Sequence, residues 1–206
     1  KDCLKYDTKS QIVKPQYVVQ KLWELTKGDA YICSDVGQHQ MITNRYYRFK
    51  KQKSIVTSGG AGTMGFALPA AFGAKVAVPH REVAAIIGDG GFQMTLQELG
   101  TIAQSGLPVK IIILNNNFLG MVRQWQQLFF DNRYSFVELQ NPDFITIAKG
   151  FGINGHKVSD RSLLSESLDT LLSSDKPYLL EIVCEKEGNV FPMVPAGSTV
   201  TNVRLE

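Results

Sequence analysis

Two apolar stretches of the chain end in polar residues that are able to bind a metal ion. Asp89 follows the run 83–87, and Asn116 comes shortly after the run 109–114. A hard cation such as Mg²⁺ prefers oxygen ligands, usually one or two carboxylates completed by amide, carbonyl and phosphate oxygens. Asp89, Asn116 and the main-chain carbonyl of Phe118 would form such a set if the two stretches are neighbouring strands.

Glycines surround these residues and favour a phosphate ligand. Gly88, Gly90 and Gly91 flank Asp89. Because Gly90 and Gly91 have no Cβ, their N–H groups can come close to a phosphate at the start of the following helix. The pattern predicts a metal-bridged diphosphate. Each loop taken alone also suits an ordinary tight turn, and the Asn pair also suits an Asx turn before a helix near Gly120.

The hydrophobic pattern predicts the elements that position these residues. Short, continuously apolar runs indicate strands at 30–34, 54–57, 83–87, 109–114 and 178–183. Helical periodicity predicts helices at 15–27, 64–78, 95–104, 121–129, 142–151 and 161–172. Strands buried on both faces and joined by helices are parallel. We therefore expect an α/β fold with a doubly wound, mainly parallel sheet, helices on both faces and ligands at the carboxyl ends of the strands.

Composition sets the broader class. The chain has 206 residues, 44% hydrophobic and 20% charged, which is typical of a globular domain. We expect an extension at 1–14, one domain at 15–185 and a tail at 186–206. A net charge of +3 with scattered basic residues gives no sign of a nucleic-acid surface. No apolar run approaches the roughly 20 residues of a membrane span, and the polar first residues do not resemble a signal peptide.

The cysteines are odd in number and far apart. Cys33 and Cys184 fall in apolar, strand-like runs, and Cys3 is near the start. We expect buried thiols without chemistry, as in a reducing, cytoplasmic compartment.

A dinucleotide site is the main alternative at this stage. Residues 60–65 fit G-x-G-x-x-G between an expected strand and a helix, and Asp89 follows at about the spacing of a ribose-binding acid. That fingerprint is weak by itself, and it gives "GDGGF" and "NNN" no role. An NAD site also normally uses the first strand, whereas here a strand precedes it.

The longer pattern resembles a known family. G-D-G at 88–90 followed by N-N at 115–116 resembles the thiamine diphosphate motif. Within that superfamily the chain is similar to the C-terminal, diphosphate-binding domain of the large, catalytic subunit of acetohydroxyacid synthase (acetolactate synthase). The similarity runs from about residue 15 to 197. It is carried by "SDVGQHQM", "TSGGAGTMGFALPAAFGAK", "GDGGFQMTLQELGT", "LPVKIIILNNNFLGMVRQWQ" and "PMVPAG".

The resemblance implies roles for individual residues. Asp89, Asn116 and the Phe118 carbonyl would hold Mg²⁺. Met64 would wedge beneath thiamine diphosphate and bend it into a V, and the Gly62 carbonyl would accept a hydrogen bond from its 4'-amino group. Without the family, Met64 would be ordinary gap-filling. The full set of implied cofactor contacts is Val36, Gly37, Gln38, His39, Gly62, Met64, Gly88, Asp89, Gly90, Gly91, Asn116, Phe118, Gly120 and Met121.

We expect no site role for the other two histidines or for Glu98 of the expected helix 95–104. His80 and His156 are expected in surface loops, and Glu98 is expected to be a surface or packing residue. His39 is singled out only by its place in "VGQHQM".

The resemblance also implies a substrate pocket formed by Met121, Val122 and Trp125. Trp125 resembles the residue that favours 2-ketobutyrate over pyruvate as acceptor; one methylene in an apolar pocket is worth roughly 1 to 3 kcal/mol. The implied reaction condenses pyruvate with a second 2-keto acid with loss of CO₂, in branched-chain amino-acid biosynthesis. "GMVRQW" and "PMVPAG" favour this synthase over another thiamine diphosphate decarboxylase, carboligase or oxidase. If the resemblance is set aside, the spacing of Met121 and Trp125 indicates only the core-facing side of a helix.

Other parts of the implied enzyme have no counterpart in the chain. The family supplies the Glu that activates the cofactor from an N-terminal pyrimidine-binding domain of the partner subunit, and its central domain holds FAD. The full enzyme would be a homodimer or tetramer, with a possible regulatory small subunit. We expect the chain alone to be catalytically inert.

Overall fold

Six strands form one sheet in which every neighbouring pair is parallel. The structure is a computed structural model and describes residues 5–205. The strand order is β2-β1-β3-β4-β6-β5. The strands are β1 Tyr31–Ser34, β2 Ile55–Val56, β3 Val83–Gly88, β4 Lys110–Asn115, β5 Asn154–Val158 and β6 Tyr178–Val183. The predicted α/β fold with a parallel sheet is confirmed.

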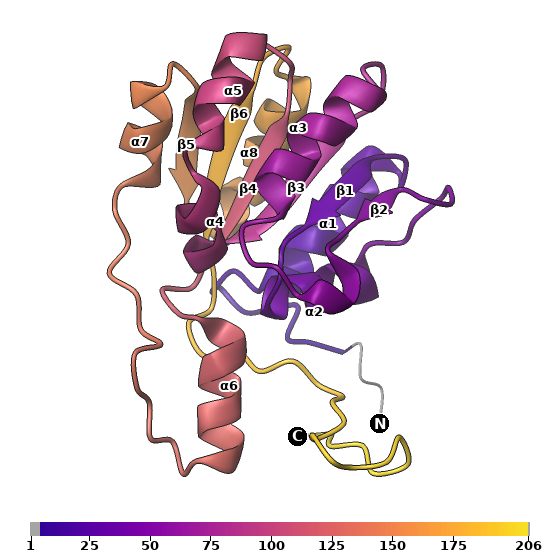
Figure 1. Cartoon of the computed structure of the whole chain (residues 1–206), viewed down its shortest axis with the longest axis vertical. Helices are drawn as coiled ribbons and strands as arrows, with labels where there is room; N and C mark the ends of the chain where they lie inside the picture. Colours follow the sequence, from indigo (N-terminus) through magenta and orange to yellow (C-terminus); the bar gives the residue numbers. More distant parts are fainter. Residues whose placement is uncertain (1–4, 206) are drawn as a thin grey trace.

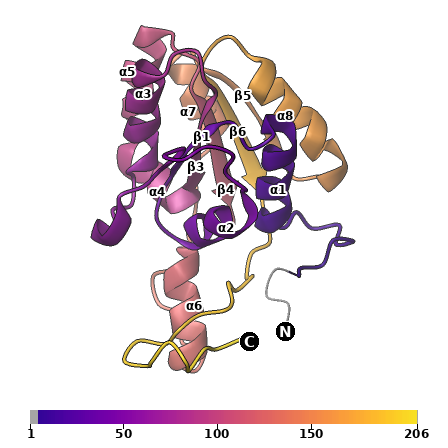
Figure 2. The ribbon, with the colours of Figure 1, turned by 90° about the vertical axis from the view of Figure 1, so that its right-hand side faces the viewer.

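Helices cover both faces of this sheet, as Figures 1 and 2 show. On one face, α3, α4, α5 and α7 pack in a layer; on the other, α1 and α8 lie side by side, with α2 near the end of the sheet. The helices are α1 Pro15–Thr26, α2 Gln38–Tyr46, α3 Ala67–Ala77, α4 Asp89–Thr95, α5 Glu98–Ser105, α6 Gly120–Phe129, α7 Phe144–Gly150 and α8 Leu164–Ser173. Short 3₁₀ turns occur at Gly59–Ala61 and Arg161–Leu163.

The core consists of two apolar clusters, one on each side of the sheet. Alternate residues of a strand point to opposite faces, so Ile86 packs with α1 and α8 while Ile87 packs with α3 and α5. All residues of β3 and β4 are buried. This explains why their sequences are apolar without alternation, and why both could be predicted.

The register of β3 and β4 brings their ends together. Gly88 pairs with Leu114, so Asp89 and the Asn residues that follow β4 emerge at the same edge of the sheet. Helix α6 projects beyond this edge, and the C-terminal segment runs beside it (Figure 1). Gln124 of α6 fixes that segment, because its side chain both donates to the carbonyl of Val190 and accepts from its N–H, at 3.1 and 2.9 Å.

Several elements differ from the expectations. Strand β5, "NGHKV", is too polar to be recognised, so placing His156 in a surface loop was wrong: it lies on this edge strand, with Nδ1 2.9 Å from the Tyr178 hydroxyl. Helices α2 and α4 were missed because neither has a clear apolar stripe, and α4 contains Gly90 and Gly91. Helix α3 begins at Ala67, so Met64 lies in the preceding loop.

Burial of two cysteines is confirmed. Cys33 and Cys184 are free thiols in the interior, and burial raises the pKa of Cys33 to about 12. Cys3 lies outside the described residues. Among residues 5–205, no helix has the length and apolar character needed to cross a membrane.

Candidate functional site

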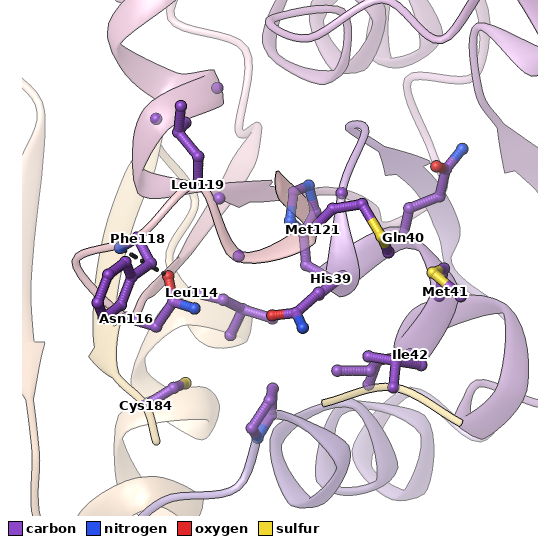
Figure 3. A pocket seen from close by; sticks show the side chains of 18 of the residues that line it. His39, Gln40, Met41, Ile42, Leu114, Asn116, Phe118, Leu119, Met121 and Cys184 are labelled. Carbon is purple, nitrogen blue, oxygen red and sulfur yellow. Dashed lines mark hydrogen bonds between the residues drawn. The ribbon is translucent and has the colours of Figure 1, made fainter. Parts of the chain in front are cut away.

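A cavity of about 430 Å³ opens at the carboxyl end of the sheet. Its walls come from the β1–α2 segment, the β3–α4 and β4–α6 turns, the loop before α3 and the C-terminal segment. Figure 3 shows Asn116 and Phe118 on one side of the pocket, Met41 and Ile42 on the other, and His39 between them. This is the position at which parallel α/β sheets bind their ligands.

The cavity brings together nearly all of the predicted site residues. Those that line it are Val36, Gly37, Gln38, His39, Gly62, Met64, Gly88, Asp89, Gly90, Gly91, Asn116, Phe118, Gly120, Met121 and Val122. Trp125 is the exception. It lies further along α6, partly exposed, and its ring packs against Phe129 with centroids 4.9 Å apart.

Asp89 is the acidic group of the cavity best placed to hold a cation. Its side chain is buried, and burial raises its pKa to about 6, while a hydrogen bond from Asn141 and nearby main-chain N–H groups act in the opposite direction. Asn116 follows the neighbouring strand, and its Oδ1 accepts a 3.2 Å bond from the Phe118 N–H.

The donor set fits Mg²⁺ better than a transition metal. Among residues 5–205, no three His, Cys, Asp or Glu side chains come together as a metal site. A cation beside Asp89 would therefore depend on the Asn116 amide, a main-chain carbonyl and oxygens of the ligand itself. Mg²⁺ is commonly held in this way, by few carboxylates together with phosphate oxygens.

Gly37, Gly88 and Gly90 of the cavity wall are closely packed. A Cβ on Gly90 would lie 2.7 Å from Leu119 Cδ2 and 3.8 Å from Met64 Cε. A Cβ on Gly37 or on Gly88 would lie 2.9 Å from Cε1 of His39. Side chains at these positions would close the space between the two walls of the cavity.

His39 has an unused polar atom in the cavity wall. Its Nε2 is buried and has no hydrogen-bond partner within the described part of the chain. Burial lowers the pKa of His39 to about 4, so the ring is neutral at physiological pH. An orphaned ring nitrogen beside a glycine-lined cavity fits a ligand that carries hydrogen-bonding oxygens.

Gln38 is already bonded to protein groups. Its Nε2 donates to Gln124 Oε1 at 2.8 Å and to the carbonyl of Gly188 at 2.9 Å. This side chain joins α2 to α6 and to the C-terminal segment. Its amide nitrogen therefore stabilises the cavity wall through bonds to protein groups.

Asp35 was not predicted as part of the site. It is fully buried, and its Oδ1 accepts from the N–H of Ala67 at 3.2 Å. A Cβ on Gly91 would overlap its Oδ2. Burial raises the pKa of Asp35, partly offset by main-chain N–H groups that include Gly65. The residue thus links the loop that carries Met64 to the turn that carries Asp89.

Asn141 and Gln93 were also missed. The Asn141 amide donates to Asp89 Oδ2 at 2.7 Å, and Gln93 donates to the Asn141 carbonyl oxygen at 2.9 Å. Asn141 is far from Asp89 in sequence and belongs to no recognisable motif. Only the tertiary fold brings the two together.

The fold and the cavity define a parallel α/β domain with a cavity at the carboxyl end of its sheet, where such domains bind small-molecule ligands. The family model "Thiamine pyrophosphate enzyme, C-terminal TPP binding domain" matches residues 35–182. The chain belongs to this family of thiamine pyrophosphate enzymes.

Curated relatives agree with this membership. The Acetolactate synthase isozyme 3 large subunit of Escherichia coli (strain K12) is 46% identical over 100% of this chain and 36% of its own length. The mitochondrial Acetolactate synthase catalytic subunit of Aspergillus candidus is 48% identical over 90% of this chain and 27% of its own. The Acetolactate synthase large subunit of Lactococcus lactis subsp. lactis (strain IL1403) is 42% identical over 93% and 33%. The chain thus spans 27–36% of the length of these relatives.

Proposed function

We propose that the chain is the cofactor-binding domain of an acetohydroxyacid synthase and binds thiamine diphosphate through Mg²⁺. The observation that carries the proposal is the cavity at the ends of β3 and β4, which is lined by a buried carboxylate, an Asn side chain and several glycines. Asp89, Asn116 and the Phe118 carbonyl would hold the cation. The family match and the acetolactate synthase relatives support the same cofactor.

The remaining cavity residues would bind and orient the cofactor. Gly90 and Gly91 line the cavity and would present their N–H groups to the diphosphate, and the unpartnered Nε2 of His39 would bond to its oxygens. Met64, partly exposed in the cavity, would support the rings, and the carbonyl of Gly62 would accept from the cofactor's amino group. When bound, thiamine diphosphate accepts the electron pair released as CO₂ leaves a 2-keto acid.

The substrates of this proposal are pyruvate and a second 2-keto acid, either pyruvate or 2-ketobutyrate. Met121 and Val122 line the cavity and would contact them. Trp125, in the middle of α6, does not line the cavity, and its ring packs against Phe129. Its role in acceptor preference rests on the resemblance of "GMVRQW" to the synthase.

The complete enzyme would need parts outside this chain. We take residues 15–185 as the domain, preceded by an extension and followed by the tail from 186. The pyrimidine-binding and FAD-binding domains, a homodimer or tetramer, a possible regulatory subunit and a cytoplasmic location belong to the same proposal. The relatives extend well beyond the part that matches this chain, which is 27–36% of their length.

Thermal unfolding tests the proposed ligand. The chain is heated with thiamine diphosphate plus Mg²⁺, with thiamine diphosphate plus EDTA, and with NAD. At about one hundred times the dissociation constant a ligand stabilises by about 2.7 kcal/mol, or roughly 5 to 10 °C for a domain of this size. A shift only with thiamine diphosphate and metal is expected. A shift with NAD alone would instead assign residues 60–65 to a dinucleotide site.

A different thiamine diphosphate enzyme is the second candidate. A decarboxylase, carboligase or oxidase would use the same Asp89 and Asn116 arrangement. Trp125 is a residue by which the sequence favours the synthase over these enzymes. It does not line the cavity, so the cavity itself fits the second candidate equally well.

A further inference from the structure

The side chain of Asn141 lies at the centre of a polar cluster beside Asp89. Its amide nitrogen is 2.7 Å from Asp89 Oδ2, 3.0 Å from Asn115 Oδ1 and 2.9 Å from Asn117 Oδ1. These three oxygens belong to two different strand ends. One neutral donor group therefore joins the end of β3 to the turn that follows β4.

The orientation of the Asn141 amide is fixed by Gln93. Gln93, one turn after Asp89 in α4, donates from Nε2 to Asn141 Oδ1 at 2.9 Å. Because the Asn141 oxygen accepts this bond, its nitrogen must face the Asp89 carboxylate. The reversed amide would set its oxygen against Asp89 Oδ2 and its nitrogen against a donor.

The main chain around Asn141 is also anchored. The connection from α6 returns along the side of the molecule to α7 (Figure 1). The Leu139 N–H donates to the Asn117 carbonyl at 2.8 Å on one side. On the other, Asp143 caps α7 by accepting from Ile145 and Thr146 at 3.0 and 3.1 Å. Asn141 is thus held in place between two fixed points.

The bonds of Asn141 bear on the geometry of the neighbouring metal candidates. Asn115 Oδ1 accepts from Asn141 and also from the N–H of Asn117 at 3.0 Å, which stabilises the turn that presents Asn116 and Phe118. The bond to Asp89 Oδ2 sets the rotation of the carboxylate. A neutral amide does this without adding a positive charge that would repel a cation.

We propose that Asn141 is a positioning residue for the divalent cation of this site, a role that rests on the proposed thiamine diphosphate function. Before the cation binds, it holds the Asp89 carboxylate and the Asn115–Asn117 turn in the positions from which Asp89, Asn116 and Phe118 would coordinate the cation. Partners that orient metal ligands typically contribute 10- to 100-fold to metal affinity.

Mn²⁺ titration of the 206-residue chain, in saturating thiamine diphosphate and followed by electron paramagnetic resonance, tests this role. Asn141→Ala should raise the Mn²⁺ dissociation constant by roughly 10- to 100-fold while still binding one Mn²⁺ per chain at saturation. Asn154→Ala, which removes an exposed asparagine from β5, is the matched control and should match the wild type. An Asn141→Ala dissociation constant within about twofold of the wild type would overturn the proposal.

Amide hydrogen exchange in metal-free protein separates this proposal from the proposed function. The Asn117 N–H, which bonds to Asn115, should exchange roughly tenfold faster in Asn141→Ala, while amides in the middle of β4 keep their rates. If the wild type binds no Mn²⁺, the cofactor assignment fails, and this exchange measurement alone decides whether Asn141 positions the turn. Unchanged exchange at Asn117 would refute the positioning role.

Discussion

Protonation of His39 should destabilise the fold between pH 6.5 and about pH 4. The ring packs against two glycines, since a Cβ on Gly37 or Gly88 would lie 2.9 Å from its Cε1. Its Nε2 has no partner within residues 5–205, so no acceptor stabilises a positive charge there. For this reason burial lowers the pKa of His39 from 6.5 to about 4.

The sign and size of the effect follow from this shift. As the pH falls, the unfolded chain binds the proton first, so the stability present above pH 6.5 is lost as the pH falls to about 4. Each pKa unit corresponds to about 1.36 kcal/mol, which makes the full loss about 3 kcal/mol. For a chain of this length that is roughly 6 to 12 °C in Tm.

Asp89 acts in the opposite direction. Burial raises its pKa from 3.8 to about 6, so the folded chain takes up this proton first and gains stability as the pH falls through 6. The two effects largely cancel in the wild type. The His39 effect must therefore be measured as a difference from His39→Phe, which keeps an aromatic ring and removes the titration.

Urea unfolding of metal-free protein between pH 7 and about pH 4 provides the assay. The unfolding free energy of the wild type minus that of His39→Phe should fall by about 3 kcal/mol across this range. His80→Phe, which replaces an exposed histidine outside the cavity, is the matched control. A wild-type minus His39→Phe difference that stays constant within about 0.5 kcal/mol would refute the reasoning. It would mean that the folded protein accommodates the charged ring.

Three further predictions concern the cavity and its turns. Asp89→Ala should abolish the Mg²⁺-dependent thermal shift with thiamine diphosphate while the chain still unfolds cooperatively; an unchanged affinity would exclude the metal assignment. Gly91→Ala should lower the unfolding free energy in urea by about 1 to 3 kcal/mol, because the new Cβ overlaps Asp35 Oδ2. The control Gly60→Ala, where a Cβ meets nothing within 4 Å, should stay within about 0.5 kcal/mol. The purified chain should form no acetolactate from pyruvate, and detectable product would contradict its dependence on other domains.

The sheet could be predicted because its central strands are buried on both faces. Continuous apolar runs located β3, β4 and β6 within a residue or two, and the helical connections implied parallel pairing. The same logic fails for β5, which is at the sheet edge, has only one buried residue among five and, among the described strands, pairs only with β6. Edge strands need little hydrophobicity, so their sequences carry little signal.

The cavity residues could be predicted because their positions follow from topology. Parallel strands bring their carboxyl ends to one edge, so residues far apart in sequence meet wherever two strands end in register. Motif spacing then placed Asp89, Asn116 and the glycines in one cavity. Trp125 was assigned from the motif alone, and the helix directs it elsewhere.

The residues that support the site could not be predicted from the sequence. Asp35 and Asn141 act through side-chain hydrogen bonds to distant segments, and those bonds depend on rotamers and loop paths that no local pattern encodes. For Asp35 the observable sign is burial beside a glycine, since Gly91 is required by the Asp35 carboxyl rather than by its own backbone angle. A glycine in a helix normally costs about 1 kcal/mol relative to alanine. Its presence at position 91 of α4 therefore indicates that space for a buried acid outweighs local helix stability.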